Sequence, residues 1–273
     1  MSRVELHHGA ATDVGLVREV NEDAYLVAPP VFVVADGMGG HDRGDIASRI
    51  VVEEFRRLAE AGYPAHSGSE VIAATLRAAQ DRIGAYDADR RAEGAADFNA
   101  GTTAVVALLV EQDGAPRWLL ANLGDSRIYR CSGGALEQVS VDHSVVQELI
   151  TAGALRPEEA EHHPERHVIT RALGGQGAIE ADYFLLPLAS AERLLLCTDG
   201  VSGMVADDVL AGILAGAPDP RDAADRVVAA AVAAGGRDNA TAVVIDVVGW
   251  SADDGYDSDA SRRSLQEKLG ALP

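Results

Sequence analysis

The stretch VFVVADGMGG, from Val31 to Gly40, indicates the fold most directly, because an apolar run stops abruptly at an Asp-Gly pair. The same ending recurs in RLLLCTDGVSG, from Arg193 to Gly203. Short runs of branched and aromatic apolar residues predict buried strands. Asp-Gly is also a common turn pair, because glycine adopts positive φ freely and aspartate tolerates turn geometry. Two explanations remain open: two unrelated turns, or two carboxylates at strand ends that converge on one site.

Further acids lie at the edges of other predicted strands. Asp125 in NLGDSRIY lies between two strand-like runs, Asp238 in GGRDNATAVVI precedes the last strand, and Glu22 in VNEDAYLV precedes another. Mg²⁺ and Mn²⁺ prefer carboxylate and carbonyl oxygens, and a pair of such ions can drive an in-line displacement at phosphorus. Arg18 is a candidate phosphate ligand, because a guanidinium group matches phosphate oxygens. Taken singly, however, each acid is more often a turn or cap residue than a metal ligand.

Composition narrows the class of protein. The chain has 273 residues, of which 47% are hydrophobic, and a formal net charge of −20. This length supports one large domain or at most two, and the excess of acid excludes nucleic acid and anionic membrane surfaces as partners. No apolar run is long enough for a membrane segment in this chain, and the N-terminus lacks the apolar core of a signal peptide. Cys131 and Cys197 lack a metal-binding spacing, so we expect a reduced, cytoplasmic protein.

The apolar periodicity predicts an α+β fold. Short strands joined by tight turns indicate mostly antiparallel sheets. The segment 156–177 is polar and rich in glycine and histidine, which is typical of a lid-like loop. Helical spacing of apolar residues predicts helices over residues 45–62, 69–92, 143–155, 206–214 and 220–234.

Seven short motifs occur together in a particular order. They are VREVNEDA, VVADGMGG, AGTTAVV, NLGDSRIY, ITRALGG, CTDGVSGMV and GGRDNATAV. This ordered set resembles the metal-dependent serine/threonine protein phosphatases of type 2C, and most closely their bacterial branch. The resemblance implies a four-layer αββα sandwich with two central antiparallel β-sheets. It also implies a catalytic domain over residues 1–248 with a flap-like insertion at 144–177, followed by an acidic, flexible tail at 249–273.

The resemblance also assigns roles to the core acids. Asp36 would bridge two metal ions, Mn²⁺ or Mg²⁺, and the backbone carbonyl of Gly37 would bind one of them. Asp199 and Asp238 would bind the other. These roles would answer the opening question in favour of two carboxylates that converge on one site.

The resemblance assigns roles to three further candidates, and this chain departs from the family pattern at two nearby positions. Glu22 would hold a metal-bound water, and Arg18 would grip the substrate phosphate. Asp125, together with Asp199, would bind a third and weaker ion. Gly203 stands where many members carry an acid for that ion. Met38 stands where many eukaryotic members carry a histidine general acid.

The function implied by the resemblance is hydrolysis of phosphoserine and phosphothreonine in proteins by a water that bridges two metal ions. The expected partners are phosphorylated proteins, including substrates or members of a serine/threonine kinase pathway, and the chain is expected to be a monomer. Two alternatives remain open. One is a non-catalytic, phosphoprotein-binding regulator of the same fold, and the other is a phosphatase of small metabolites.

Overall fold

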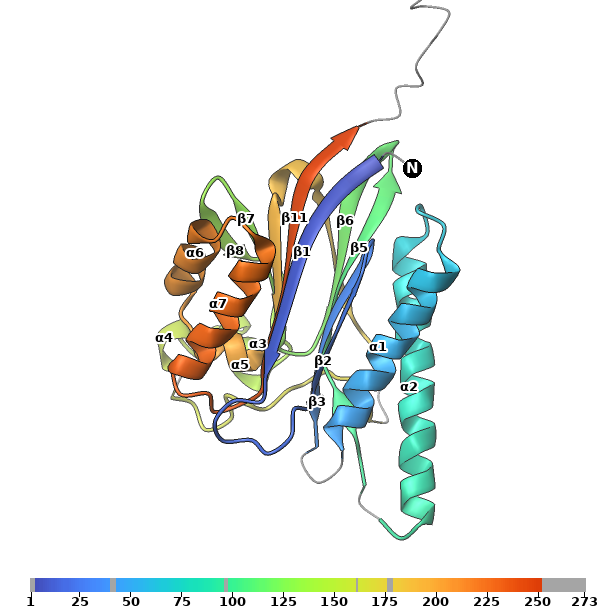
Figure 1. Ribbon diagram of the computed structural model, residues 1–273. Coiled ribbons are helices and arrows are strands. Elements are labelled where there is room, and N and C mark those ends of the chain that lie inside the picture. Colours follow the sequence, from blue (N-terminus) through green and yellow to red (C-terminus); the bar gives the residue numbers. More distant parts are fainter. Residues whose placement is uncertain (1–2, 40–42, 96–97, 161, 176–178, 252–273) are drawn as a thin grey trace, which may run out of the picture.

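A computed structural model describes residues 3–39, 43–95, 98–160, 162–175 and 179–251. Two antiparallel sheets lie face to face between two pairs of helices (Figure 1). The predicted four-layer α+β sandwich is thereby confirmed. None of the helices in these residues has both the length and the apolar character that crossing a bilayer requires.

The first sheet joins the two ends of the described chain. Its strand order is β1-β11-β10-β7-β8, and β1 pairs with β11 from Arg3↔Ser251 to Asp13↔Ala240. This pairing sets the loop after β1, which carries Arg18, beside the loop before β11, which carries Asp238. The strands are β1 Arg3–Asp13, β7 Arg127–Ser132, β8 Ala135–Gln138, β10 Arg193–Cys197 and β11 Ala240–Ser251.

The second sheet carries the first Asp-Gly pair. Its strand order is β2-β3-β5-β6-β9, with the short β4 paired to β3. Register places Asp23 of β2 opposite Asp36 of β3. The strands are β2 Asp23–Ala28, β3 Val31–Met38, β4 Gly101–Thr102, β5 Ala104–Gln112, β6 Ala115–Leu123 and β9 Asp182–Pro187.

The two Asp-Gly pairs do not form the turns that their composition suggests. β3 continues through Asp36 to Met38, because Gly37 pairs with Thr102 of β4 and its N–H donates to the Glu22 carbonyl at 3.2 Å. Asp199 instead begins the short helix α5, Asp199–Ser202. The expectation that both strands end at Asp-Gly is therefore correct for β10 and wrong for β3.

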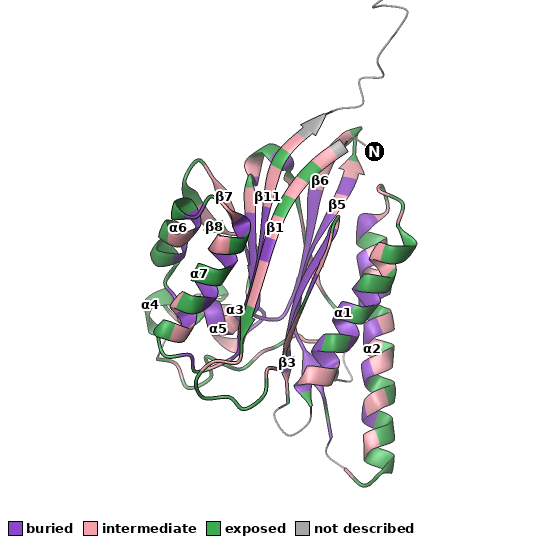
Figure 2. Cartoon of the chain, in the orientation of Figure 1, coloured by how far each residue is buried: buried purple, intermediate pink, exposed green. Residues whose placement is uncertain are grey.

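The helices cover the outer faces of the two sheets. α1 and α2 lie against the second sheet, and α6 and α7 lie against the first (Figure 1). Their inward faces are buried and their outward faces exposed, as amphipathic periodicity requires (Figure 2). The bounds, which lie close to the predicted ranges, are α1 Gly44–Ala61, α2 Gly68–Ala92, α6 Asp207–Gly216 and α7 Pro220–Ala233.

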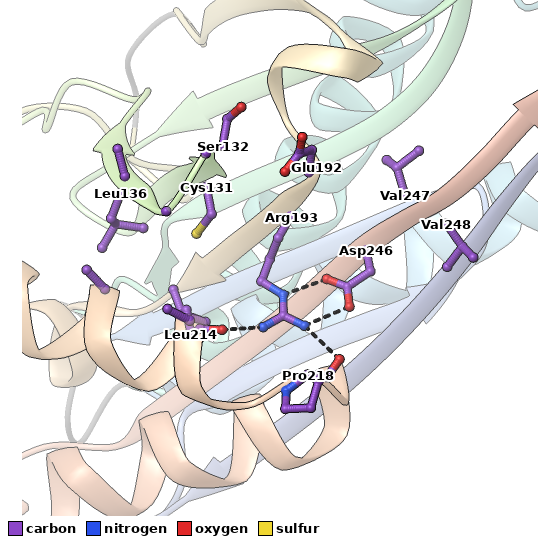
Figure 3. A pocket seen from close by; sticks show the side chains of 15 residues that line it. Cys131, Ser132, Leu136, Glu192, Arg193, Leu214, Pro218, Asp246, Val247 and Val248 are labelled. Atoms are coloured by element: carbon purple, nitrogen blue, oxygen red, sulfur yellow. Dashed lines mark hydrogen bonds and ion pairs between the residues drawn. The ribbon is translucent and has the colours of Figure 1, made fainter.

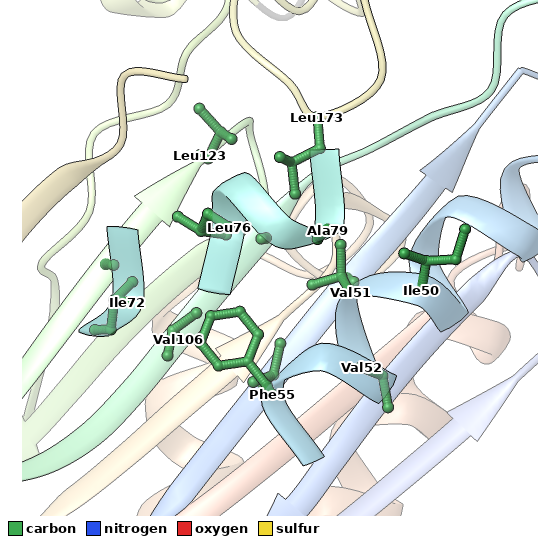
Figure 4. Close-up of a cluster of buried hydrophobic side chains, with 14 of the residues drawn as sticks. Ile50, Val51, Val52, Phe55, Ile72, Leu76, Ala79, Val106, Leu123 and Leu173 are labelled. Carbon is green, nitrogen blue, oxygen red and sulfur yellow. The ribbon is translucent and has the colours of Figure 1, made fainter. Parts of the chain in front are cut away.

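Three buried clusters hold the layers together. In one, Phe55 of α1 and Leu76 of α2 pack on Val106 of β5 (Figure 4). Between the sheets, the rings of Phe32 and Trp118 meet edge to face at 6.1 Å. A third cluster fills the space between the first sheet and α5–α7. The inter-sheet cluster fixes the separation at which groups from the two sheets face each other.

The flap-like segment contains two short helices, α3 Val145–Thr151 and α4 Pro157–Ala160. The loop predicted from residue 156 onward therefore contains α4. The backbone bridge Thr102↔Leu173 ties its base to β4 of the second sheet, and the bridge Ser144↔Ile169 joins two parts of the segment itself. A 3₁₀ turn, η2 Leu188–Ser190, follows β9. At the other end of the chain, β11 extends past Val248, where the tail was expected to begin. Tail residues beyond Ser251 lie outside the described residues.

Candidate functional site

Carboxyl groups from both sheets face one another at one end of the sandwich. Burial raises the pKa of Asp36 well above its ordinary value, and the charges of Asp23, Asp199 and Asp125 raise it further. Burial also raises the pKa of Asp199, followed by the charge of Asp238. Solvent still reaches part of Asp36 and Asp199. The acids singled out from the sequence therefore form one cluster, in which the charges of Asp199 and Asp238 repel Asp36 while a side-chain hydrogen bond to Asp36 partly offsets the rise in the pKa of Asp199.

Arg18 lies against this cluster. Its Nη2 donates to Asp238 Oδ2 at 2.7 Å, and this hydrogen bond raises the pKa of Arg18. The charges of Glu22 and Asp36 raise it further. The structure thus brings together the predicted phosphate ligand and three of the predicted acids. The ion pair with Asp238 holds the Arg18 guanidinium in place.

Glu22 and Gly37 meet through their backbones. A Cβ added to Gly37 would lie 2.3 Å from the Gly44 carbonyl oxygen and 2.5 Å from that of Glu22, so only glycine fits. The same Glu22 carbonyl accepts from Ser48 Oγ at 2.6 Å. Burial raises the pKa of the Glu22 carboxyl. This close packing holds the backbone of Gly37 directly against the backbone of Glu22.

Asp125 is held in the turn between β6 and β7. Its Oδ1 is buried and lacks a hydrogen-bond partner. Burial raises its pKa to about 7, and the Asp199 charge acts in the same direction. The turn is fixed at Gly124, whose N–H donates to His143 Nδ1 at 3.1 Å, while the Gly124 carbonyl accepts from the His143 N–H at 2.9 Å.

Sequence reasoning missed several residues that hold this site. Asp23 lies beside Glu22, and its Oδ2 accepts from Thr198 Oγ1 at 2.9 Å; burial raises its pKa to about 7. Thr103 was not among the candidates. Its Oγ1 in fact accepts from the Asp36 N–H at 3.0 Å and lies 2.7 Å from Ser126 Oγ. The available signal was the position of Asp23 directly beside Glu22, and of Thr103 inside the quoted motif AGTTAVV.

Asn239, next to Asp238, was also overlooked. Its Oδ1 accepts from the Glu22 N–H at 2.8 Å, and its Nδ2 donates to the carbonyls of Val14 and Val20, each at 3.0 Å. One buried amide therefore fastens both ends of the loop that carries Arg18.

The donor set fits a hard divalent cation. The donors are carboxylate oxygens and backbone carbonyl oxygens, which Mg²⁺ and Mn²⁺ prefer. One of them, Asp125 Oδ1, is buried without a hydrogen-bond partner, and several negative charges surround Asp36. In the described part of the chain, no three His, Cys, Asp or Glu side chains already stand as close as one ion requires. Repulsion between carboxylates opposes such closeness, and a bound cation would offset that repulsion.

A cavity of about 400 Å³ lies elsewhere, beside β8 and α6 (Figure 3). At its base Arg193 pairs with Asp246, with Nε 2.6 Å from Oδ1. The same guanidinium donates to the carbonyls of Leu214, Ala217 and Pro218 at the end of α6. Arg193 thus caps the C-terminus of α6. The cavity contains none of the clustered carboxylates and is not the candidate site.

A family model described as protein phosphatase 2C matches residues 17–232. The matched range includes all seven candidates except Asp238, and it covers well over half of the chain. The chain belongs to the protein phosphatase 2C family. The family expected from the ordered motifs is confirmed, as is the expected enzyme class, a serine/threonine protein phosphatase.

Curated relatives and solved structures agree with this assignment. The chain is 33% identical over 250 residues to the serine/threonine phosphatase stp of Listeria monocytogenes, a match that covers 88% of this phosphatase and 96% of the relative. The crystal structure of the Mycobacterium tuberculosis serine/threonine phosphatase PstP/Ppp superposes with a TM-score of 0.79 at 34% identity, over 90% of this chain and 99% of that one.

A second solved structure bears on the cofactor. The catalytic domain of PstP in complex with two manganese ions matches with a TM-score of 0.77 at 33% identity, over 90% of this chain and 100% of that one. This neighbour supports the expectation that the phosphatase uses divalent metal ions.

Proposed function

We propose that this phosphatase hydrolyses phosphoserine and phosphothreonine in proteins with two divalent ions, Mn²⁺ or Mg²⁺, held at the carboxylate cluster. The ions would supply an activated water between them and positive charge for the phosphoryl oxygens. The observation that carries the proposal is the convergence of Asp36 with Asp199 and Asp238, whose charges add to burial in raising the pKa of Asp36.

The metal ligands follow from this cluster. Asp36 would contact both ions because it lies at the centre of the mutual interactions, and the Gly37 carbonyl would join it on one side. Asp199 and Asp238 would hold the second ion, and Glu22 would hold a water of the ion shell. Carboxylates and carbonyls are the oxygen ligands that Mg²⁺ and Mn²⁺ prefer.

Arg18 would bind the phosphate of the substrate. Its guanidinium lies 2.7 Å from Asp238, so a phosphate bound by Arg18 would lie beside the carboxylates that hold the ions. A planar guanidinium can donate two parallel hydrogen bonds to phosphate oxygens, which orients the phosphorus for in-line attack.

A third, more weakly held ion would complete the site. Asp125 would contribute to it through the unpartnered Oδ1, with Asp199 nearby. Gly203 offers no carboxylate, so this ion would retain more water than the other two. Met38 has no titratable group to protonate the leaving serine or threonine, so that proton would come from elsewhere.

The organisation of the chain is also a proposal. Residues 1–248 would form the catalytic domain, with 144–177 as a flap over substrate and 249–273 as an acidic tail. We further propose a cytoplasmic monomer that acts on phosphoproteins of a serine/threonine kinase pathway. Sedimentation at micromolar concentration tests the monomer, since a dimer would double the measured mass.

The test of the central proposal is hydrolysis of a phosphothreonine peptide with Mn²⁺, with excess chelator, and by Asp238→Ala. Asp225→Ala is the matched control, because Asp225 is an exposed acid on α7. We expect turnover that requires both metal and Asp238 and survives Asp225→Ala. No turnover by folded protein in Mn²⁺ would favour a non-catalytic, phosphoprotein-binding regulator. Turnover of phosphorylated metabolites alone would favour a metabolite phosphatase.

A further inference from the structure

The loop that carries Arg18 exposes an unusual amount of apolar side chain. Leu16, Val17 and Val20 are 71%, 67% and 58% exposed, the three highest values among the exposed large hydrophobic residues of the described chain. Single exposed apolar residues are ordinary, but three in the stretch 16–20 form a local apolar surface. This surface lies at the end of the sandwich where β1 turns toward β2 (Figure 1), and burial colouring marks the loop as exposed (Figure 2).

The exposure does not come from a loosely attached loop. The Leu16 N–H donates to the Gly236 carbonyl at 2.7 Å, and Asn239 holds the carbonyls of Val14 and Val20. Gly15 has φ of 79°, and a Cβ there would lie 2.4 Å from the Asp238 carbonyl oxygen. The backbone is thus fastened to the loop before β11, and its apolar side chains are held in water. Binding at such a preorganised surface costs little conformational entropy.

The apolar surface lies on the same short loop as the candidate phosphate ligand. Val17 precedes Arg18 directly, and Val20 follows it by two positions. A phosphorylated side chain bound by Arg18 would bring its neighbouring residues close to this loop.

From these contacts we infer that the side chains of Val17 and Val20 form a docking surface for apolar residues that flank the phosphorylated residue of a substrate protein. The inference rests on the proposed function and specifies its substrate class. Arg18 recognises the phosphate whatever the sequence around it, whereas the apolar surface favours one class of flanking residue.

Charge around the loop argues against an acidic partner. Asp13, Glu19 and Glu22 lie in or beside the loop, and the chain as a whole carries −20. An acidic flanking residue would meet these carboxylates, while an apolar one would cover Val17 and Val20 and remove them from water. The favoured substrate is a phosphopeptide whose flanking residues are apolar rather than acidic.

The test compares three phosphothreonine peptides that differ only in the residues on either side of phosphothreonine: leucine, serine or aspartate. p-Nitrophenyl phosphate, which has no flanking residues, is measured in parallel with Mn²⁺. The variant is Val17→Ser/Val20→Ser. Leu16 is left in place because it packs beside Gly236, where an added Cβ would lie 3.0 Å from its Cγ. Val209→Ser is the matched control, because Val209 is 49% exposed on α6.

We expect wild type and Val209→Ser to prefer the leucine peptide over the serine peptide by about tenfold in kcat/KM, and over the aspartate peptide by more. In the double variant the preference should fall to about twofold, and the ratio of leucine peptide to p-nitrophenyl phosphate should fall with it. The preference should appear mainly in KM, which a general loss of structure would not produce.

Other outcomes overturn the inference in different ways. Equal hydrolysis of all three peptides by wild type would leave the phosphatase proposal standing and remove the docking surface. A preference for the leucine peptide that survives in the double variant would show that another part of the protein recognises the flanking residues. A dimer that dissociates in the double variant, without a change in preference, would assign the surface to a second copy of the chain. No metal-dependent hydrolysis of any substrate would remove both proposals.

Discussion

Asp36 is the residue on which the candidate site depends most. Its backbone N–H donates to Thr103 Oγ1, and its backbone carbonyl accepts from Thr102 Oγ1 and the Thr103 N–H. These contacts fix the backbone and leave the carboxyl free to face the other acids. The residue therefore presents a charge that burial and neighbouring carboxylates disfavour, an arrangement typical of functional sites.

Asp36→Asn should lower kcat for a phosphothreonine peptide by about a thousandfold or more, because the amide keeps the shape but cannot balance two cations. Its thermal stability without metal should not fall, since a raised pKa means that the ionised carboxyl destabilises the folded state above that pKa. Turnover and melting temperature check the two parts. Near-normal turnover by the folded, Mn²⁺-loaded variant would contradict the role of Asp36.

Arg18→Ala should raise KM for the same peptide by about tenfold or more and change kcat less, because it removes a phosphate contact rather than a ligand of the ions. Arg226→Ala is the control, because Arg226 is an exposed arginine that pairs with Asp222 on α7. Steady-state kinetics separates the two constants. An unchanged KM would exclude Arg18 from the substrate site.

The two thiols give a prediction about pH. Burial raises the pKa of Cys197 to about 12 and that of Cys131 to about 11, so both remain protonated at pH 8. Because the thiolate is the reactive form, the native protein should react with a disulfide reagent far more slowly than the unfolded chain. The reaction of Cys131 should become faster as the pH rises toward 10. Rapid reaction of native protein at pH 8 would contradict this.

At the scale of elements, close backbone contacts at glycine join the pieces of the site. Gly200 of α5 lies against the loop before β11, where an added Cβ would be 1.8 Å from the Asn239 carbonyl oxygen. This contact sets Asp199 beside Asp238. The second Asp-Gly pair therefore needs its glycine for helix-to-loop packing and not for a turn.

Gly200→Ala should lower the free energy of unfolding by at least about 2 kcal/mol, because backbone atoms cannot yield as side chains do. Gly212→Ala on α6 is the opposite case: its added Cβ meets no atom within 4 Å, so helix propensity should stabilise the protein by up to about 1 kcal/mol. Urea unfolding measures both. Equal effects of the two substitutions would show that the Gly200 contact is unimportant.

At the scale of the whole molecule, the site exists only when the two sheets are packed together. Asp36 comes from the second sheet, whereas Asp199 and Asp238 adjoin strands β10 and β11 of the first. The inter-sheet cluster around Phe32 and Trp118 holds these strands at a fixed separation. A cation bound between the acids would therefore add a link between sheets.

Mn²⁺ should raise the melting temperature, since a ligand that binds only the folded state stabilises it. At a free concentration of about 100 Kd the gain is about 2.7 kcal/mol, or roughly 5–10 °C for a protein of this size. Asp238→Ala should reduce the shift, and Asp225→Ala should leave it intact. Calorimetry with and without chelator measures it. A shift of the same size in Asp238→Ala would place the stabilising ion elsewhere.

Helix positions were predictable because amphipathic periodicity is a local property. The ranges 69–92 and 220–234 nearly coincide with α2 and α7. Strand continuity was less predictable, because pairing partners lie far away in sequence. β3 continues past Asp36 only because β4, more than sixty residues later, supplies its ladder partner. The same distance hid Thr103 and Asn239, whose roles depend on which backbone lies opposite.

The sequence by itself determined the family, the order of elements and the kind of chemistry, because seven ordered motifs and a set of strand-edge acids are legible without coordinates. Only the tertiary structure decided how these acids meet. It revealed Asp23 within the cluster, paired Arg18 with Asp238, and turned Val17 and Val20 outward beside Arg18. The physical reason is that composition and periodicity specify which surfaces are buried, whereas distances between residues two hundred positions apart depend on how two sheets pack.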